Sequence, residues 1–255
     1  ATLLMNSGSN IDAARGDGCT ALHVAAQKGH AAVVAALLDR GANVEAATAK
    51  GATALLAAAK CGHTEMVTLL LDRGANVETA AANCRTALYA AADMGHAAAV
   101  AVLLQRGANT ERHTTEGITP LQVASQRGYT DVVTLLLDGG ANINATPAHS
   151  RAALCVAAAH GHIHVVQLLL QRGAKVEMVD DRGQTPLYTA VEQGYVEIVA
   201  LLLACGANVQ TAAADCRTPL FVAGRRHHEK VVVLLLQSGG VAEGVVHCGA
   251  TSLCL

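Results

Sequence analysis

The sequence predicts an all-α solenoid in which short helix-turn-helix units stack side by side and present extended hairpin tips. Three observations predict it. The chain of 255 residues repeats itself every 33 residues without insertion or deletion. Hydrophobic residues make up 52% of the chain but aromatic residues only 2%, which suits thin layers of closely packed helices better than one large core. Each unit also carries the start and stop signals of two helices.

The repeat is visible at three landmarks. A Thr-Ala-Leu or Thr-Pro-Leu triplet begins at residues 20, 53, 86, 119, 185 and 218, with Ala-Ala-Leu at 152. A Gly followed by His or Tyr stands at residues 29, 62, 95, 128, 161 and 194. A Gly-Ala pair stands at residues 41, 74, 107, 140, 173 and 206. Because all three keep one register, the repeat is not a chance similarity.

The first complete unit shows how each element is specified. Thr20 is a favoured N-cap, and the Ala-rich stretch 22–28 that follows is predicted to be a helix. Gly29 ends this helix, because Gly enters the left-handed C-terminal conformation without strain. A second helix is predicted over 30–40, where apolar residues recur at helical spacing, and Gly41 ends it. Residues 42–51 are predicted to form an extended turn.

We expect one array over residues 1–255. It has a partial unit at 1–14, seven full units at about 15–47, 48–80, 81–113, 114–146, 147–179, 180–212 and 213–245, and a partial unit at 246–255. Helices this short are unstable alone, so contacts between units must stabilise them.

Terminal units need a polar outer face. The apolar ends (Leu3, Leu4, Leu253 and Leu255) therefore predict an excised part of a longer array, unless these residues fold back.

Composition excludes several classes of function. With 18 basic and 20 acidic residues, the net charge of −2 gives no basic patch for nucleic acid. No apolar run reaches about 18 residues, so no membrane span is expected. The eight cysteines show neither a CxxC pair nor a disulfide framework, which favours free thiols in a reducing compartment. We therefore expect an intracellular, most simply cytoplasmic, monomer.

Catalytic and metal sites are the least supported reading. The sequence contains no phosphate-binding loop or dinucleotide fingerprint, and no cofactor is expected. His160, His162 and His164 are the best metal candidates, but Gly161 interrupts the helix between them and His162 belongs to the repeating Gly-His landmark. Cys155 lies near His160 in sequence and is a candidate nucleophile, although its Ala-rich helix favours a buried thiol. We expect neither a metal site nor an enzyme.

The units resemble ankyrin repeats, whose signature is Thr-Pro-Leu-His-x-Ala at a period of 33 residues. The nearest stretches are Thr20-Ala21-Leu22-His23-Val24-Ala25 and Thr119-Pro120-Leu121-Gln122-Val123-Ala124, and the resemblance covers essentially the whole chain. Departures include Ala152 in place of the Thr and His227 in place of a helix-ending Gly. The resemblance implies a non-catalytic protein–protein interaction module, within a larger scaffold, adaptor or effector protein. An engineered or consensus-derived binder is the alternative, but eight cysteines and irregular fifth and seventh units argue against design.

The resemblance also implies that a partner contacts the turn tips and first helices on the concave side of the stack. Carried over position by position, the partner-binding residues are Lys50, Ala52, Lys60, Asn83, Arg85, Asp93, Met94, Glu116, Ile118, Gln126, Arg127, His149, Arg151, Arg182, Gln184, Asp215 and Arg217. A basic series runs through Arg85, Arg127, Arg151, Arg182, Arg217, Arg225 and Arg226. Because Arg is enriched at interface hot spots, we expect a protein partner with an acidic stripe.

One modification site follows from the same resemblance. Asparaginyl hydroxylases act on an Asn in the turn of many ankyrin repeats, and the matching position here is Asn144. The corresponding residues of the other units are Glu or Gln, so Asn144 is the single candidate for hydroxylation.

Overall fold

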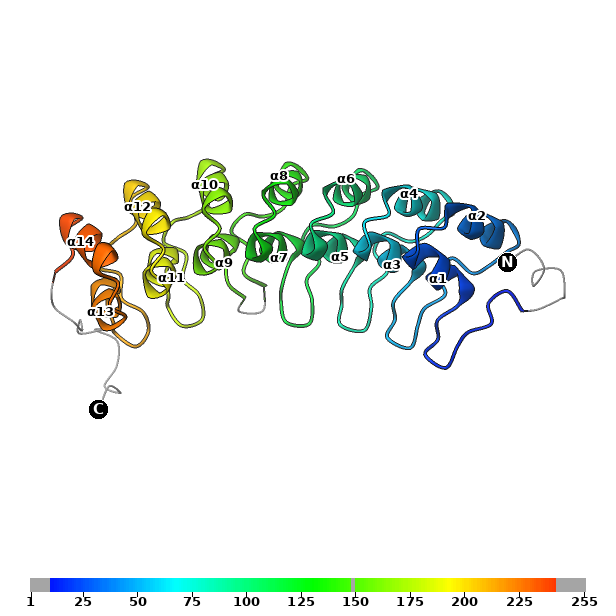
Figure 1. Ribbon diagram of the computed structural model, residues 1–255, viewed down its shortest axis with the longest axis horizontal. Helices are drawn as coiled ribbons and strands as arrows, with labels where there is room; N and C mark the ends of the chain where they lie inside the picture. The colour runs from blue at the N-terminus through cyan, green and yellow to red at the C-terminus, as the bar shows by residue number, and fades with distance from the viewer. Residues whose placement is uncertain (1–9, 148–149, 242–255) are drawn as a thin grey trace. The chain divides into compact units, whose positions relative to one another are not determined.

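A computed structural model describes residues 10–147 and 150–241, and helix-turn-helix units follow one another throughout this part (Figure 1). The two described ranges contain fourteen α-helices and no β-strand. The prediction of an all-α fold built from repeated helix pairs is thus confirmed. His149 and the apolar ends (Leu3, Leu4, Leu253 and Leu255) lie outside the described residues.

Each unit has a first helix of seven or eight residues and a second helix of nine. The first helices are α1 (Ala21–Gln27), α3 (Ala54–Lys60), α5 (Ala87–Met94), α7 (Pro120–Arg127), α9 (Ala153–Ala159), α11 (Pro186–Gln193) and α13 (Pro219–Arg225). The second helices are α2 (Ala31–Asp39), α4 (Thr64–Asp72), α6 (Ala97–Gln105), α8 (Thr130–Asp138), α10 (Ile163–Gln171), α12 (Val196–Ala204) and α14 (Glu229–Gln237). The bounds predicted for the first pair agree to within one residue.

The chain divides into two compact bodies, which are described separately. The N-terminal body contains α1 to α6 and all of α8 except Thr130, and the C-terminal body contains α9 to α14. Helix α7 contributes residues to both. In the N-terminal body α1, α3 and α5 pack in one row, and α2, α4 and α6 pack in a second row (Figure 1). The C-terminal body repeats this arrangement with α9, α11 and α13 against α10, α12 and α14. Each body is therefore two helices thick.

Threonine caps begin most first helices. The hydroxyl oxygen of Thr53 accepts the backbone N–H of Leu56 at 3.3 Å, and Thr86 does the same for Tyr89 at 3.2 Å. Thr20 is capped differently, because its N–H donates to His23 Nδ1 at 3.3 Å while His23 Nε2 donates to the Ala52 carbonyl at 2.9 Å. The signature His therefore joins two units. Ala152 makes no side-chain cap, as its side chain has no oxygen.

The Gly-His landmark joins successive units. His96 Nε2 donates to the carbonyl of Lys60, at the end of the preceding first helix, over 3.1 Å. Gly62 has a φ of +73°, and a Cβ there would lie 2.5 Å from the His96 ring. The same hydrogen bond joins His63 to Gln27, His162 to Gln126 and His228 to Glu192, at 2.8 to 3.2 Å. The Gly that ends a first helix thus leaves room for the His ring of the following unit. That ring donates a hydrogen bond to a carbonyl that the helix end leaves without an intrahelical partner.

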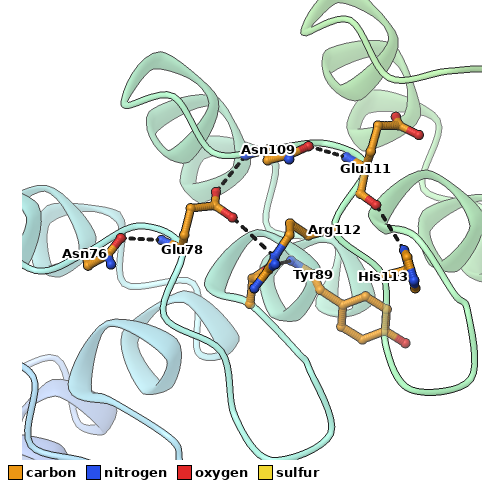
Figure 2. Close-up of polar contacts among 8 residues, drawn as sticks. Asn76, Glu78, Tyr89, Asn109, Glu111, Arg112 and His113 are labelled. Carbon is orange, nitrogen blue, oxygen red and sulfur yellow. Dashed lines mark hydrogen bonds and ion pairs between the residues drawn. The ribbon is translucent and has the colours of Figure 1, made fainter.

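A second set of contacts runs along the turns that follow the second helices (Figure 2). Glu78 Oε1 accepts the backbone N–H of Asn109 in the next unit at 2.7 Å, and Asn109 Oδ1 accepts the N–H of Glu111 at 2.8 Å. Glu45, Glu111 and Glu177 each accept an equivalent N–H 31 residues later. Glu78 Oε2 also lies 3.5 Å from Arg112 Nε. These carboxylates hold each turn at a fixed distance from the next.

The hairpin tips are joined by single backbone hydrogen bonds. Ala82 N–H donates to the Lys50 carbonyl at 2.9 Å, and Ala214 N–H donates to the Arg182 carbonyl at 2.9 Å. Gly51 and Gly183 sit at these tips with positive φ, but Cys84 occupies the same position with a φ of +59°. The bond across Cys84, from Thr115 N–H to the Asn83 carbonyl, is longer, at 3.2 Å. A residue with a Cβ is therefore strained at this position.

The ring of His96 should contribute measurably to stability. We expect His96→Ala to lower the free energy of unfolding by about 2 kcal/mol, because it removes a packed ring and leaves the Lys60 carbonyl without its donor. The matched control is His30→Ala at the same position of the first described pair, where the side chain is exposed. Urea unfolding followed by circular dichroism measures both variants. Equal losses for the two would contradict the role given to the landmark.

Replacing Cys84 by Gly should stabilise the chain by about 1 kcal/mol, because a left-handed φ is unfavourable for a residue with a Cβ. The reciprocal change, Gly51→Cys, should destabilise it, since a Cβ at Gly51 would lie 3.1 Å from the Ala82 nitrogen. The thermal unfolding midpoints of the two variants, compared with that of the parent chain, test both expected changes in stability. The explanation fails if Cys84→Gly lowers the midpoint.

Candidate functional site

A groove of about 370 Å³ lies in the N-terminal body. We call it the α3–α5 groove, since its walls are α3, α5 and the hairpin tips that precede them. Its lining residues are Lys50, Ala52, Leu56, Lys60, Ala81, Ala82, Asn83, Arg85, Tyr89, Ala90, Asp93 and Met94. Seven of the predicted partner-binding residues therefore lie together (Lys50, Ala52, Lys60, Asn83, Arg85, Asp93 and Met94).

The rim of the α3–α5 groove is mainly cationic. Lys50, Lys60 and Arg85 are all exposed, and they come from one tip, the end of α3 and the next tip. Asp93 is the one carboxylate among the lining residues. We expected its side chain to face solvent, but only 8% of the residue is exposed. The exposed charge at the rim is therefore positive.

Tyr89 and Leu56 form part of the wall and were not among the predicted site residues. They occupy equivalent positions in successive units, at the place of the signature His. Tyr89, labelled in Figure 2, is 4% exposed. The Arg85 guanidinium carbon lies 5.1 Å from the centroid of the Tyr89 ring. Such a cation–π contact orients the guanidinium. The signal that could have found both residues is the change of the signature His to larger apolar or aromatic side chains.

Two predicted tip residues shape their own tips. Asn83 Oδ1 accepts the backbone N–H of Arg85 at 3.3 Å, and Asp215 Oδ1 accepts that of Arg217 at 3.2 Å. Side-chain hydrogen bonds to the backbone two residues later are typical of tight turns. These two side chains therefore have a structural role as well as the predicted binding role.

The remaining predicted residues are spread over both bodies. Glu116, Gln126, Arg127 and Arg182 are exposed, whereas Ile118 and Gln184 are half-buried. Gln126 Nε2 lies 3.5 Å from His160 Nε2.

The predicted basic series is partly neutralised by internal ion pairs. Arg151 Nε lies 2.8 Å from Asp180 Oδ2, Arg217 Nε lies 3.5 Å from Asp215 Oδ2, and Arg226 lies 2.8 Å from Glu192. The Asp180 side chain is fully buried, and its Oδ1 accepts the N–H groups of Arg182 and Gln184 at 2.9 Å. Arg151 thus compensates a buried carboxylate, so its charge serves the fold.

Cys155, the candidate nucleophile, is fully buried. Its Sγ donates to the Met178 carbonyl at 3.4 Å, while His160 Nδ1 donates to the Val156 carbonyl at 2.9 Å. Burial, together with the Asp180 carboxylate, raises the pKa of Cys155 to about 12 from an ordinary value of 9.0, against a smaller lowering by Arg151. A protonated thiol is a poor nucleophile, so this pair is unsuited to nucleophilic catalysis.

Two of the three candidate metal residues, His160 and His162, use ring nitrogens in hydrogen bonds to backbone carbonyls. His162 Nε2 donates to the Gln126 carbonyl at 2.8 Å, and the His162 and His160 rings stack at 6.4 Å between centroids. No group of three or more His, Cys, Asp or Glu side chains within residues 10–147 and 150–241 is arranged to hold a metal ion. No helix in these ranges is both long and apolar enough to cross a membrane.

Asn144 lies in the turn after α8 and is half-buried. Its Oδ1 accepts the backbone N–H of Lys175 at 3.0 Å, so it takes the place that Glu78 and Glu111 take in other units. Hydroxylation of Asn144 stays a prediction, and this position joins two turns.

Comparisons with known proteins agree on one family. A family model described as ankyrin repeats, in three copies, matches residues 1–81, 78–147 and 154–244. The crystal structure of the human ASB11 ankyrin repeat domain is similar, with a TM-score of 0.79 and 30% identity over 85% of this chain and 98% of that chain. In all, 606 chains of solved structures match, so the fold alone does not distinguish one partner from another. No curated protein matches the chain.

Cys155 should resist alkylation until the chain unfolds. At pH 8 a thiol with a pKa near 12 is ionised in only about one molecule in ten thousand, and it is also covered. Iodoacetamide should therefore modify the exposed Cys61 and Cys205 and leave Cys155 unmodified, as mapped by peptide mass spectrometry. In 8 M urea, the pKa returns to its ordinary range and all should react. Equal labelling of Cys155 and Cys61 in the native chain would show that the thiol is accessible and ionised.

Proposed function

The chain belongs to the ankyrin-repeat family, a general protein-interaction module, and from this we propose that it binds a partner protein without catalysis through its hairpin tips and first helices. The single observation that carries the proposal is the α3–α5 groove. It brings together Lys50, Lys60 and Arg85 on tip and first-helix positions of two successive units.

The variable residues of the units support this choice of face. Landmark residues hold the units together, whereas the tip and first-helix positions carry different side chains in each unit, such as Lys60, Asp93 and Gln126 at one equivalent position. A repeating frame with varied surface residues allows one scaffold to recognise a particular partner. We propose a partner with an acidic stripe, because the exposed rim of the groove is cationic.

The proposal places the array in a scaffold, adaptor or effector protein that acts as a monomer inside the cell. These roles need only a recognition surface. The cysteines among the described residues are free thiols, which is typical of proteins in a reducing compartment.

Site-specific photocrosslinking in cells can test which face binds. A benzophenone amino acid at Glu116 or Arg182 is on a tip, whereas the same group at Ala98 or Gln167 is exposed on a second helix. We expect one common partner to be crosslinked from the tip positions and not from the second-helix positions, as identified by mass spectrometry. Crosslinks of equal yield from Ala98 and Gln167 would assign binding to the other face and overturn the proposal.

A further inference from the structure

We propose that the α3–α5 groove binds an extended segment of a partner protein in which acidic side chains flank one apolar side chain. The inference rests on the proposed function and names the chemistry of the segment. It is carried by three features of the groove: the position of its cations, the apolar surface between them, and the orientation of Arg85.

The cations surround the groove. Lys50 lies on the tip before α3, Lys60 lies in the last turn of α3, and Arg85 lies on the tip before α5. The one carboxylate in the lining, Asp93, is largely covered. A segment entering the groove therefore meets positive charge at both tips and at the helix end, which favours carboxylates and disfavours Lys or Arg.

The surface between the cations is apolar. Leu56 is half-buried, and Ala52, Ala81 and Ala90 line the walls with small side chains. Met94 is 40% exposed, and its flexible thioether adapts to an incoming side chain. A volume of about 370 Å³ is in the range of pockets that bury ligand groups, so it admits an apolar side chain with its neighbouring backbone.

Arg85 is already placed for a carboxylate. Its guanidinium is held over the Tyr89 ring at 5.1 Å, while the Tyr89 backbone N–H is bound by Thr86. A preorganised guanidinium loses less conformational entropy on binding, and its planar fork can take both oxygens of a carboxylate. Arg85 is therefore the expected anchor for one acidic side chain.

The spacing of the units sets the spacing of the acids. Packed helices lie about 8–10 Å apart, which equals about three residues of extended chain. Acidic side chains about three residues apart can therefore meet one cation in each unit, with the apolar side chain between them.

A peptide selection on the full chain tests the inference. Phage carrying random dodecapeptides are selected on the immobilised chain, and selected peptides are synthesised with a fluorescein label and titrated by fluorescence anisotropy. We expect enrichment of peptides with two acidic residues around one apolar residue. Arg85→Glu and Lys60→Glu should each weaken binding at least about tenfold, as expected for hot-spot residues. Met94→Ser should weaken it by a smaller factor.

The matched control is Lys230→Glu, an equal charge change at an exposed residue of α14 that lies outside the groove and outside the predicted partner-binding residues. It should leave the dissociation constant within about twofold of the parent chain, and circular dichroism of every variant confirms that the fold is kept. Arg182→Glu is a second variant, at a tip outside the groove. If it weakens binding while Arg85→Glu does not, the groove inference is wrong and the proposed function stands.

Three further outcomes would also overturn the inference. If selected peptides bind equally to all variants, the peptides do not use the tips, and the proposed function fails as well. If a single-stranded DNA dodecamer binds with the affinity of the best peptide, the groove is a general polyanion site. Selected peptides without acidic residues would also contradict the assigned chemistry.

Discussion

The structure depends on one close approach, in which an aromatic ring at the start of a second helix lies against the Gly that ends the first helix of the preceding unit. It is present at Gly29, Gly62, Gly128, Gly161 and Gly194. At Gly62 a methyl group would lie 2.5 Å from the His96 ring, and at Gly161 a methyl group would lie 2.9 Å from the Tyr195 ring. These positions require Gly for two reasons: the backbone has a left-handed φ, and a Cβ would occupy the space of the neighbouring ring. Where the ring is His, its Nε2 also satisfies the helix-end carbonyl, so packing and hydrogen bonding fix the same register.

This register determines what the surface can present. Adjoining units are joined by hydrogen bonds at three places. The Glu78 carboxylate joins the turns, the Lys50 carbonyl joins the hairpin tips, and the His96 ring binds the end of the preceding first helix. None of these three contacts uses the side chain of Lys50. A cation such as Lys50 can therefore be exchanged without loss of the stack, which leaves the binding surface open to change.

The sequence was sufficient for the helices, because their signals are local and repeat in every unit. Thr86, Gly95 and the apolar spacing between them define α5 without knowledge of its neighbours. The groove was predictable only in part. Lys50 and Arg85 follow from the register, but the contact of Arg85 with Tyr89 depends on side-chain conformation. The pairing of Arg151 with the buried Asp180 was missed, since the two residues are 29 positions apart and no local pattern links them.

The contacts between units join residues at separations that recur along the array, among them 29, 31, 32, 34 and 36 positions. Removing one codon from the middle of the array would shift every such pair that spans the deletion, and a donor would then face the wrong residue. Duplication of a complete 33-residue block preserves all the separations. Arrays of this kind can therefore lengthen or shorten during evolution by whole blocks, and single-codon changes in length are tolerated mainly outside the pairs that these separations define.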